Sequence, residues 1–292
     1  MWVNFDRTPI EVPHAEEDAA RLAPLQEWFP GLQVTPEGIR GIGGGLGGGG
    51  LSRLLGPGDG EGDSSKRSDL RRSLVVDPST GRVPVRREAL EQRSERMAHL
   101  TDAWENHTPW ERCITRGVPG GMFPALYSNG YRLLQTADYV VILYEMIHEA
   151  RIIPLDGRAH LASNTRLWNG DSRGHWEGET LVVEVTNYRD ARVGTVATSV
   201  TSTATLKGIP QSAAMRVVER FTRVGAERLR YDVTIEDPDV YTAPWTVSMP
   251  LHRDGEYQMY EYACHEGNYG LANSLSAGRA EERDAQAPDP TR

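Results

Sequence analysis

The feature that most restricts the fold of this chain is the alternation of apolar and polar residues in short segments from Tyr131 onward. It is clearest over residues 228–235, where the apolar side chains at every second position are those of Leu229, Tyr231, Val233 and Ile235. Successive side chains of a β-strand point to opposite faces, so this spacing gives a strand one apolar and one polar face. Such strands are typical of an antiparallel sheet with a core on one side only.

Short turns that contain glycine separate these segments, most clearly at Glu177–Glu179, Gly225–Glu227 and Asp254–Gly255. Turns of this kind between β-rich segments predict hairpins. The expected strands are Tyr139–Tyr144, Arg151–Pro154, His175–Trp176, Thr180–Thr186, Met215–Val224, Arg228–Ile235, Thr246–Leu251 and Tyr257–Cys264. The sequence therefore predicts a mainly β fold, an antiparallel meander that forms a lipocalin-like barrel or a strongly curved sheet, with a few peripheral helices.

The patterns divide the chain into a single β domain over residues 74–282, an N-terminal extension over 1–73 and a disordered tail over 283–292. A short strand is expected at Ser73–Val76, just before the β domain's first turn. Val85–Ala98 has strong helix formers with charged residues on most of its surface, which predicts a helix that lies on the main domain.

Within the extension, Ala15–Phe29 has the spacing of a short amphipathic helix. Gly41–Gly62 holds twelve of the thirty glycines and is expected to be a flexible linker, because ordering so many glycines costs too much conformational entropy. Gly45, Gly47 and Gly50 match the pattern GxGxxG, but no strand precedes them and no clear helix follows. Dinucleotide binding is therefore not expected there.

Composition excludes several classes of function. The chain has 32 basic and 41 acidic side chains, and the resulting net charge of −9 has the wrong sign for a general nucleic-acid binder. The longest apolar run, Tyr139–Tyr144, is far shorter than the ~18 residues of a transmembrane helix. A signal peptide is not recognised at the N-terminus, and no HExxH zinc motif is present.

The first candidate site lies where polar residues interrupt the apolar stretch 139–157. On a continuous strand Glu145, Glu149 and Arg151 share one face and His148 lies on the other, unless a bulge changes the parity. Buried ionisable groups need partners, so a Glu–Arg ion pair is one interpretation and an acid–base site is another. Metal ligation is a third, although the Glu-x-x-His spacing brings ligands together on helices rather than on strands.

The second candidate site lies at 257–269, around the end of the last expected strand. Its ionisable side chains are Glu261, His265 and Glu266, and tyrosines including Tyr260, Tyr262 and Tyr269 accompany them. Aromatic rings with hydroxyl groups suit the mouth of a ligand-binding site, and histidine gains or loses a proton near neutral pH. The alternative is that these residues stabilise the outer face of the sheet through cross-strand pairs.

A third candidate is the turn-rich stretch Trp168–Trp176, which contains Asp171 and Arg173. Aspartate, serine and glycine are ordinary turn residues, so the stretch is interpreted first as a turn. The functional alternative is a loop at the barrel mouth in which Arg173 binds a carboxylate or a sugar hydroxyl.

The two cysteines, Cys113 and Cys264, lie near opposite ends of the predicted β domain. A disulfide between them would close a long loop and imply an oxidising compartment. Two inert buried thiols are an alternative. A nucleophilic Cys264 beside His265 is a weaker one, because adjacent residues of a strand point to opposite faces.

Five segments resemble a widespread family of uncharacterised, usually exported bacterial proteins. They are ERCITRGVPG at 111–120, YEMIHEARIIPLDGRAH at 144–160, GDSRGHWEGETLVVE at 170–184, VERFTRV at 218–224 and YEYACHEGNYG at 260–270. The resemblance covers residues 74–282 and implies a periplasmic or secreted location but no particular activity. The ionisable and cysteine residues that lie in its motifs include Arg112, Cys113, Glu145, His148, Arg151, Arg158, Asp171, Arg173, Cys264, His265 and Glu266. The glycine tract and the missing signal peptide depart from the family pattern.

The function that these patterns favour is acid–base chemistry on a small molecule or carbohydrate, by a lyase, isomerase or hydrolase with its site in a barrel mouth. His148 or His265 would transfer the proton and Glu145, Glu261 or Glu266 would orient it. The side chains expected to bind substrate are those of Arg151, Arg173, Asp171, Tyr260, Tyr262 and Tyr269. No cofactor is predicted; if a divalent metal is bound, its ligands would be Glu145, His148, His265 and Glu266. Alternatives are a non-catalytic binding protein for an apolar or polyhydroxylated ligand, and an envelope interaction protein.

Overall fold

A computed structural model describes residues 1–4, 33–35, 38–40, 73–125, 128–196 and 208–286. Its main sheet is antiparallel, with nine strands in the order β7-β6-β5-β1-β12-β11-β10-β9-β8 and a tenth, β4, paired to β12. The strands are β1 Trp2–Val3, β4 Val75–Asp77, β5 Gly130–Gln135, β6 Tyr139–Tyr144, β7 Ala150–Pro154, β8 Asp171–Glu177, β9 Thr180–Thr186, β10 Arg216–Gly225, β11 Arg228–Glu236 and β12 Trp245–Arg253.

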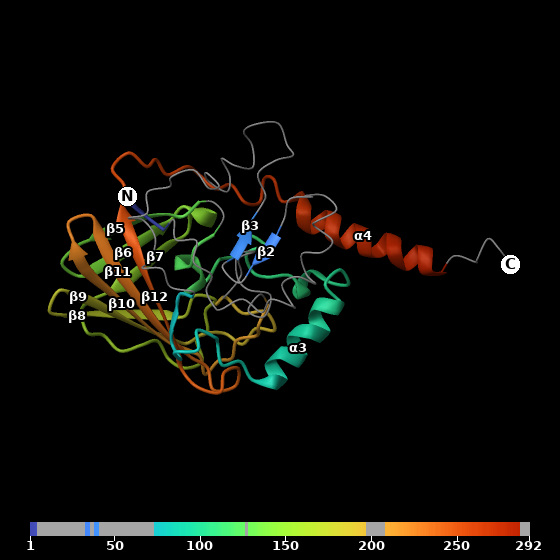
Figure 1. The fold of residues 1–292 in the computed structure, drawn as a ribbon, viewed down its shortest axis with the longest axis horizontal. Helices are drawn as coiled ribbons and strands as arrows, with labels where there is room; N and C mark the ends of the chain where they lie inside the picture. The colour runs from blue at the N-terminus through green and yellow to red at the C-terminus, as the bar shows by residue number, and fades with distance from the viewer. Residues whose placement is uncertain (5–32, 36–37, 41–72, 126–127, 197–207, 287–292) are drawn as a thin grey trace.

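The sheet curls into a nearly closed, barrel-shaped body, which Figure 1 shows on the left. This confirms the prediction of a mainly β fold with a barrel or strongly curved sheet. Two short strands, β2 Gln33–Thr35 and β3 Gly38–Arg40, pair with each other separately. The helix expected at Ala15–Phe29 and the linker expected at Gly41–Gly62 lie outside the described residues.

Large side chains fill the barrel interior. Tyr131, Tyr188, Tyr231 and Trp245 are fully buried, and aliphatic residues on alternate positions of the strands pack between them. Burying one such side chain stabilises the fold by roughly 1.5–3 kcal/mol, so this interior is the main source of stability. Any site for a ligand of substantial size is therefore to be sought on the outside of the barrel.

The gap between β7 and β8, here called the seam, separates the two ends of the sheet. In the described part of the chain no backbone ladder crosses the seam. Instead, Arg151 Nε on β7 donates a hydrogen bond to Ser172 Oγ on β8 at 3.0 Å. Gly174 on β8 permits the close approach, because a Cβ there would lie 2.8 Å from Leu155 Cδ2 and 2.9 Å from Ile153 Cγ2. Side chains thus close the barrel at the seam.

The last expected strand, Tyr257–Cys264, is wrong: this segment has no regular secondary structure. One edge of β12 pairs with β11, and the other edge is occupied by β1 and β4. No edge of β12 remains for a strand that follows it. The first residues of the N-terminal extension, at Trp2–Val3, therefore belong to the barrel, where they pair with both β12 and β5.

Two α-helices, α3 Arg87–Ala98 and α4 Tyr269–Gln286, lie to one side of the barrel in Figure 1. The first confirms the surface helix expected at Val85–Ala98, with a start two residues later. The second begins at Tyr269 and extends four residues past the expected start of the tail at 283. Among the described residues, no helix combines the length and apolar character needed to cross a membrane.

Candidate functional site

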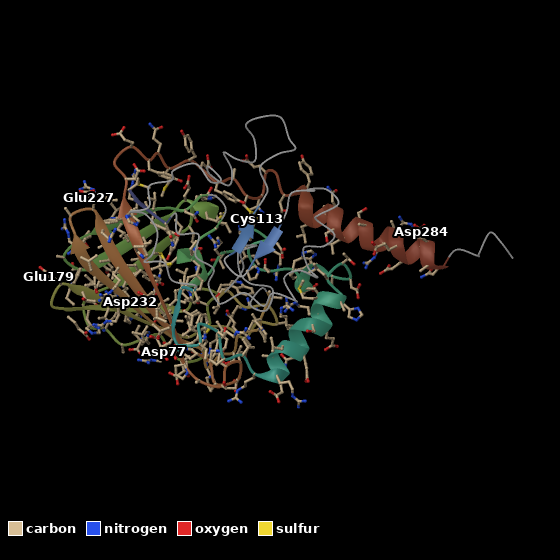
Figure 2. All side chains as sticks on the ribbon, viewed as in Figure 1. Asp77, Cys113, Glu179, Glu227, Asp232 and Asp284 are labelled. Atoms are coloured by element: carbon tan, nitrogen blue, oxygen red, sulfur yellow. A yellow bond between two sulfur atoms is a disulfide. The ribbon has the colours of Figure 1, made fainter. Side chains whose placement is uncertain are left out.

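The segment Tyr257–Asn268, here called the strap, runs in extended and turn conformations between β12 and α4. A disulfide joins its Cys264 to Cys113, which confirms the predicted pairing. Figure 2 labels Cys113 on the side of the barrel that faces the two helices. Asn268 Nδ2 donates to Glu111 O at 2.9 Å, which fixes the end of the strap beside the disulfide.

Glu145, one of the expected orienting residues, is buried at the end of β6 and holds the start of the strap. Its carboxylate accepts hydrogen bonds from the Tyr257 hydroxyl, from Gly130 N at 3.1 Å and from Tyr260 N at 3.3 Å. Burial and the adjacent carboxylate raise the pKa of Tyr257 well above its usual value. Because these donors engage its oxygens, the Glu145 carboxylate positions the strap. Its link to His148 runs through the backbone, where His148 N donates to Glu145 O at 3.1 Å.

The strand pattern is interrupted after β6 by a short 3-10 turn, Met146–His148, and His148 is the last residue of this turn. Ile147 and His148 have left-handed backbone angles, with φ of 61° and 42°. This turn replaces the continuous strand on which Glu145 and His148 would face opposite sides. As a result, both residues now contact the strap.

The imidazole of His148 is exposed, and its Nδ1 lies 2.9 Å from Tyr262 O. A carbonyl oxygen only accepts hydrogen bonds, so Nδ1 carries the proton in the neutral ring. The lone pair is then on Nε2, which has no protein partner among the described hydrogen bonds and faces outward. This is the tautomer that a general base requires.

The other ionisable residues of the strap, Glu261, His265 and Glu266, are exposed. Within the described part of the chain no hydrogen bond or ion pair links them to Glu145 or His148. Among the described residues there is also no group of three or more His, Cys, Asp or Glu side chains that could hold a metal ion. The four expected metal ligands are therefore not assembled in this arrangement.

The tyrosines expected to bind substrate are divided between two settings. Tyr260 and Tyr269 are 71% and 72% exposed, and Tyr269 is the first residue of α4 rather than part of the strap. Tyr262 is half-buried and, through its carbonyl, holds His148.

Arg151, expected to bind substrate, instead lies in the barrel interior. Its Nη1 is 3.0 Å from Glu219 Oε1 on β10, and the Tyr231 hydroxyl donates to the same oxygen at 2.8 Å. Burial raises the pKa of the neighbouring Tyr144 to about 12. A buried Glu–Arg ion pair within residues 139–157 is one interpretation of the sequence. Arg151 does form such a pair, but its partner is Glu219 on another strand. Its signal in the sequence was a glutamate at an apolar position, between Val217 and Phe221.

Asp171 and Arg173 belong to β8 and bind each other, so they do not form a loop at the barrel mouth. Arg173 Nη1 lies 2.6 Å from Asp171 Oδ1, and His160 Nδ1 lies 2.8 Å from Asp171 Oδ2. Leu161 N also donates to Asp171. The cluster fixes the loop that precedes β8. Sequence reasoning missed His160. It lies eleven positions before Asp171, and no local pattern in the sequence connects the two residues.

Two shallow hollows adjoin the strap. The first is lined by Asp254, Glu256, Tyr257, Gln258 and Tyr260. The second is lined by Trp110, Glu111, Tyr262, Cys264, Gly267 and Asn268. Tyr262, whose carbonyl binds His148, is common to the second hollow and to the histidine. This arrangement places the exposed base next to a concave surface with aromatic walls.

Comparisons with models of protein families, with curated proteins and with solved structures find no match for this chain.

Proposed function

We propose that this protein is an enzyme that uses acid–base chemistry on a small polar molecule or carbohydrate at the strap, with His148 as the general base. The observation that supports this proposal is the hydrogen bond from His148 Nδ1 to Tyr262 O, which directs the basic Nε2 outward. A base that removes a proton from a substrate needs both the free lone pair and access to it. His148 has both.

The backbone supports the same role. A left-handed conformation is costly for a β-branched residue such as Ile147, and it persists only where surrounding contacts enforce it. Ile147 and its neighbour Met146 are buried, and the next residue, His148, is bonded to the strap. The imidazole is thus held in one orientation before substrate arrives, which is what catalysis by positioning requires.

In the proposed reaction, Nε2 of His148 accepts a proton from a C–H or O–H group of the substrate, and the resulting imidazolium keeps its bond to Tyr262 O. The imidazolium then gives this proton from Nε2 to the leaving or rearranged group, which restores the neutral ring. The pattern fits a lyase, an isomerase or a hydrolase. The aromatic walls of the hollow at Trp110 and Tyr262 would hold the substrate.

The test compares His148→Gln and His148→Ala with His175→Gln in turnover assays over a panel of neutral and acidic sugars. His175 is a matched control, because it is exposed on β8 and far along the chain from the strap. Loss of a general base lowers turnover by roughly 10²–10⁴-fold. We expect that loss in both His148 variants, with little change in the temperature of unfolding.

Turnover that survives in His148→Ala would refute the assignment. Unfolding of both His148 variants would show a purely structural role for the bond to Tyr262. Turnover of no panel member by the unmutated protein would favour the second candidate described next.

The second candidate is a binding protein without catalysis, and the exposure of Tyr260 and Tyr269 favours it. Exposed aromatic rings hold a polyhydroxylated ligand without any proton transfer. Such a protein would release its ligand chemically unchanged, and its affinity would not follow the protonation of His148.

We also propose that the chain belongs to the exported bacterial family that its motifs resemble. The disulfide between Cys113 and Cys264 supports this, because structural disulfides persist mainly in oxidising compartments. Expression with and without an added export signal tests it. The proposal predicts that only the exported protein acquires the disulfide, and a disulfide formed equally well in the cytoplasm would contradict it.

A further inference from the structure

Two tryptophans and two arginines from distant parts of the chain stack on one another beside the strap. Arg112 Cζ lies 4.4 Å from the centre of the Trp104 ring and 5.9 Å from that of Trp168. Arg189 Cζ lies 4.5 Å from the centre of the same Trp168 ring. We call this group, Trp104, Arg112, Trp168 and Arg189, the Trp–Arg stack.

The stack is attached to fixed parts of the structure. Arg112 precedes Cys113 of the disulfide, and Trp168 precedes Asn169, which is bonded to Thr115 Oγ1 at 3.0 Å. Arg189 N donates to Leu167 O at 3.0 Å, which ties the two loops that carry Trp168 and Arg189. The rings and guanidinium groups are therefore held in place before a ligand binds, so binding loses little side-chain conformational entropy.

No described ion pair involves Arg112 or Arg189, although the chain carries a net charge of −9 and its other exposed arginines commonly bind carboxylates. Burial lowers the pKa of Arg112, as does the positive charge of Arg189, while Glu105 opposes both effects. Two cations on one ring without a paired carboxylate form a site that favours an anion.

A third cation is bonded to the loop that carries Arg189. Arg96 of α3 is buried, and its Nη1 donates to Arg192 O at 2.7 Å, three residues after Arg189. Among the described residues, its Nε and Nη2 have no hydrogen-bond partner. Burial, Arg93 and Arg192 lower the pKa of Arg96 to about 10. A buried cation with unpaired donors adds positive potential to the surface around the stack.

We propose that the Trp–Arg stack binds a saccharide that carries carboxylate groups. The carboxylates would pair with the N–H edges of Arg112 and Arg189, which ring stacking leaves free. The sugar ring would pack on the Trp104 face, since that residue is 47% exposed. This inference deepens the proposed function by naming the class of substrate, and it rests on that function only for the chemistry at His148. Binding itself is independent of turnover.

Carboxylated sugars fit this surface better than other anions. Planar guanidinium groups match the bidentate geometry of a carboxylate, and an exposed indole offers an apolar face of the size of a sugar ring. Inorganic phosphate would use the arginines but not the indole. A nucleic acid would face the repulsion of the remaining net negative charge.

The test measures binding of trigalacturonate to the full disulfide-bonded chain by isothermal titration calorimetry, with a neutral trisaccharide and inorganic phosphate as comparison ligands. The variants are Arg112→Gln, Arg189→Gln, His148→Gln and Arg216→Gln. Arg216 is a matched control because it is an exposed arginine that pairs with Glu184 on the sheet. Loss of one charged hydrogen-bonding group weakens binding by roughly tenfold or more.

We expect trigalacturonate to bind more tightly than both comparison ligands and to lose affinity as salt is added. Arg112→Gln and Arg189→Gln should each weaken binding about tenfold, and Arg216→Gln should not. Unchanged binding in His148→Gln, together with loss of turnover there, would separate this site from the catalytic proposal. If Arg112→Gln does not fold, the affinity of the Arg189→Gln variant decides the outcome, because Arg189 is exposed.

Equal affinity for the neutral trisaccharide would overturn the inference, as would unchanged affinity in Arg189→Gln. Phosphate that binds as tightly as trigalacturonate would overturn the choice of a saccharide. Absence of trigalacturonate binding by a protein that still turns over other sugars would reject the stack while leaving the proposed function intact.

Discussion

Arg151 on β7 and Glu219 on β10 form an ion pair inside the barrel, with Arg151 Nη1 3.0 Å from Glu219 Oε1. The strand β7 lies at one end of the sheet order, and β10 lies near the other end. The same arginine also binds Ser172 on β8, the strand across the seam. One buried side chain therefore connects the two ends of a sheet that no described backbone ladder joins.

Removing one partner of this pair should destabilise the protein strongly. Arg151→Met leaves the Glu219 carboxylate buried without a counterion, which costs about 3–5 kcal/mol. The double variant Arg151→Met, Glu219→Leu should recover much of that loss, because no unpaired charge remains. Urea unfolding measures both values. Arg220→Gln, which breaks an exposed pair with Glu177, is the control and should change stability little, because solvent screens exposed ion pairs.

The half-buried carboxyl of Glu149 predicts a pH dependence of stability. Burial raises its pKa above the ordinary 4.5, although hydrogen bonds from Thr115 and Asn169 oppose the shift. Between 4.5 and the raised pKa the folded state binds more protons than the unfolded state, so stability falls as the pH rises through this window. Glu149→Gln should flatten that fall, because an amide does not titrate.

Unfolding midpoints measured from pH 4 upward test this prediction, with Glu227→Gln as a control at an exposed carboxyl, which Figure 2 labels at the barrel end. Parallel pH curves for the unmutated protein and Glu149→Gln would contradict it.

The contacts of Glu145 with Gly130 on β5 and with Tyr257 and Tyr260 of the strap depend on the absence of a side chain at Gly130. A Cβ there would lie 2.6 Å from Tyr257 Cε1 and 2.8 Å from Glu145 Oε2. Gly130→Ala should therefore displace the start of the strap and cost about 1–3 kcal/mol. Hydrogen exchange at the Tyr260 amide, which donates to Glu145, should accelerate. Gly255→Ala is the control, because the space around its Cβ position is open. Equal exchange of the Tyr260 amide in the two variants would argue against this role of Gly130.

Loss of the disulfide should weaken the fold more than loss of any single hydrogen bond of the strap. Cys113 and Cys264 are 151 residues apart, and closing a loop of that size is worth about 4–5 kcal/mol in the chain-entropy model. Replacing both cysteines with serine should lower stability by that order and leave the strap attached at Glu145. A double serine variant as stable as the oxidised protein would disagree with this expectation.

Local patterns in the sequence were sufficient for much of the barrel. The bounds of β6 and β9 match the expected strands, and β10 and β11 form the hairpin that the turn at Gly225–Glu227 predicts. Alternation of apolar residues and turn chemistry act over a few neighbouring residues, so a single chain reveals them directly. The disulfide was predictable for a similar reason, since only two cysteines were available to pair.

The candidate site depended on contacts between distant residues. Nothing near Tyr257 indicates that Trp2–Val3 occupies the edge of β12 that Tyr257–Cys264 would need, because strand pairing is decided among all competing edges. His148 faces the strap only because a left-handed turn breaks β6 from β7.

The sequence by itself determined most of the strands between Tyr139 and Leu251 and which of their faces are apolar. The tertiary structure alone decided that Glu219 pairs with Arg151 and that Arg112 and Arg189 both lie against the ring of Trp168. The physical reason is range: backbone preference and burial pattern are properties of neighbouring residues, whereas a buried charge takes whichever opposite charge the packed sheet brings within reach.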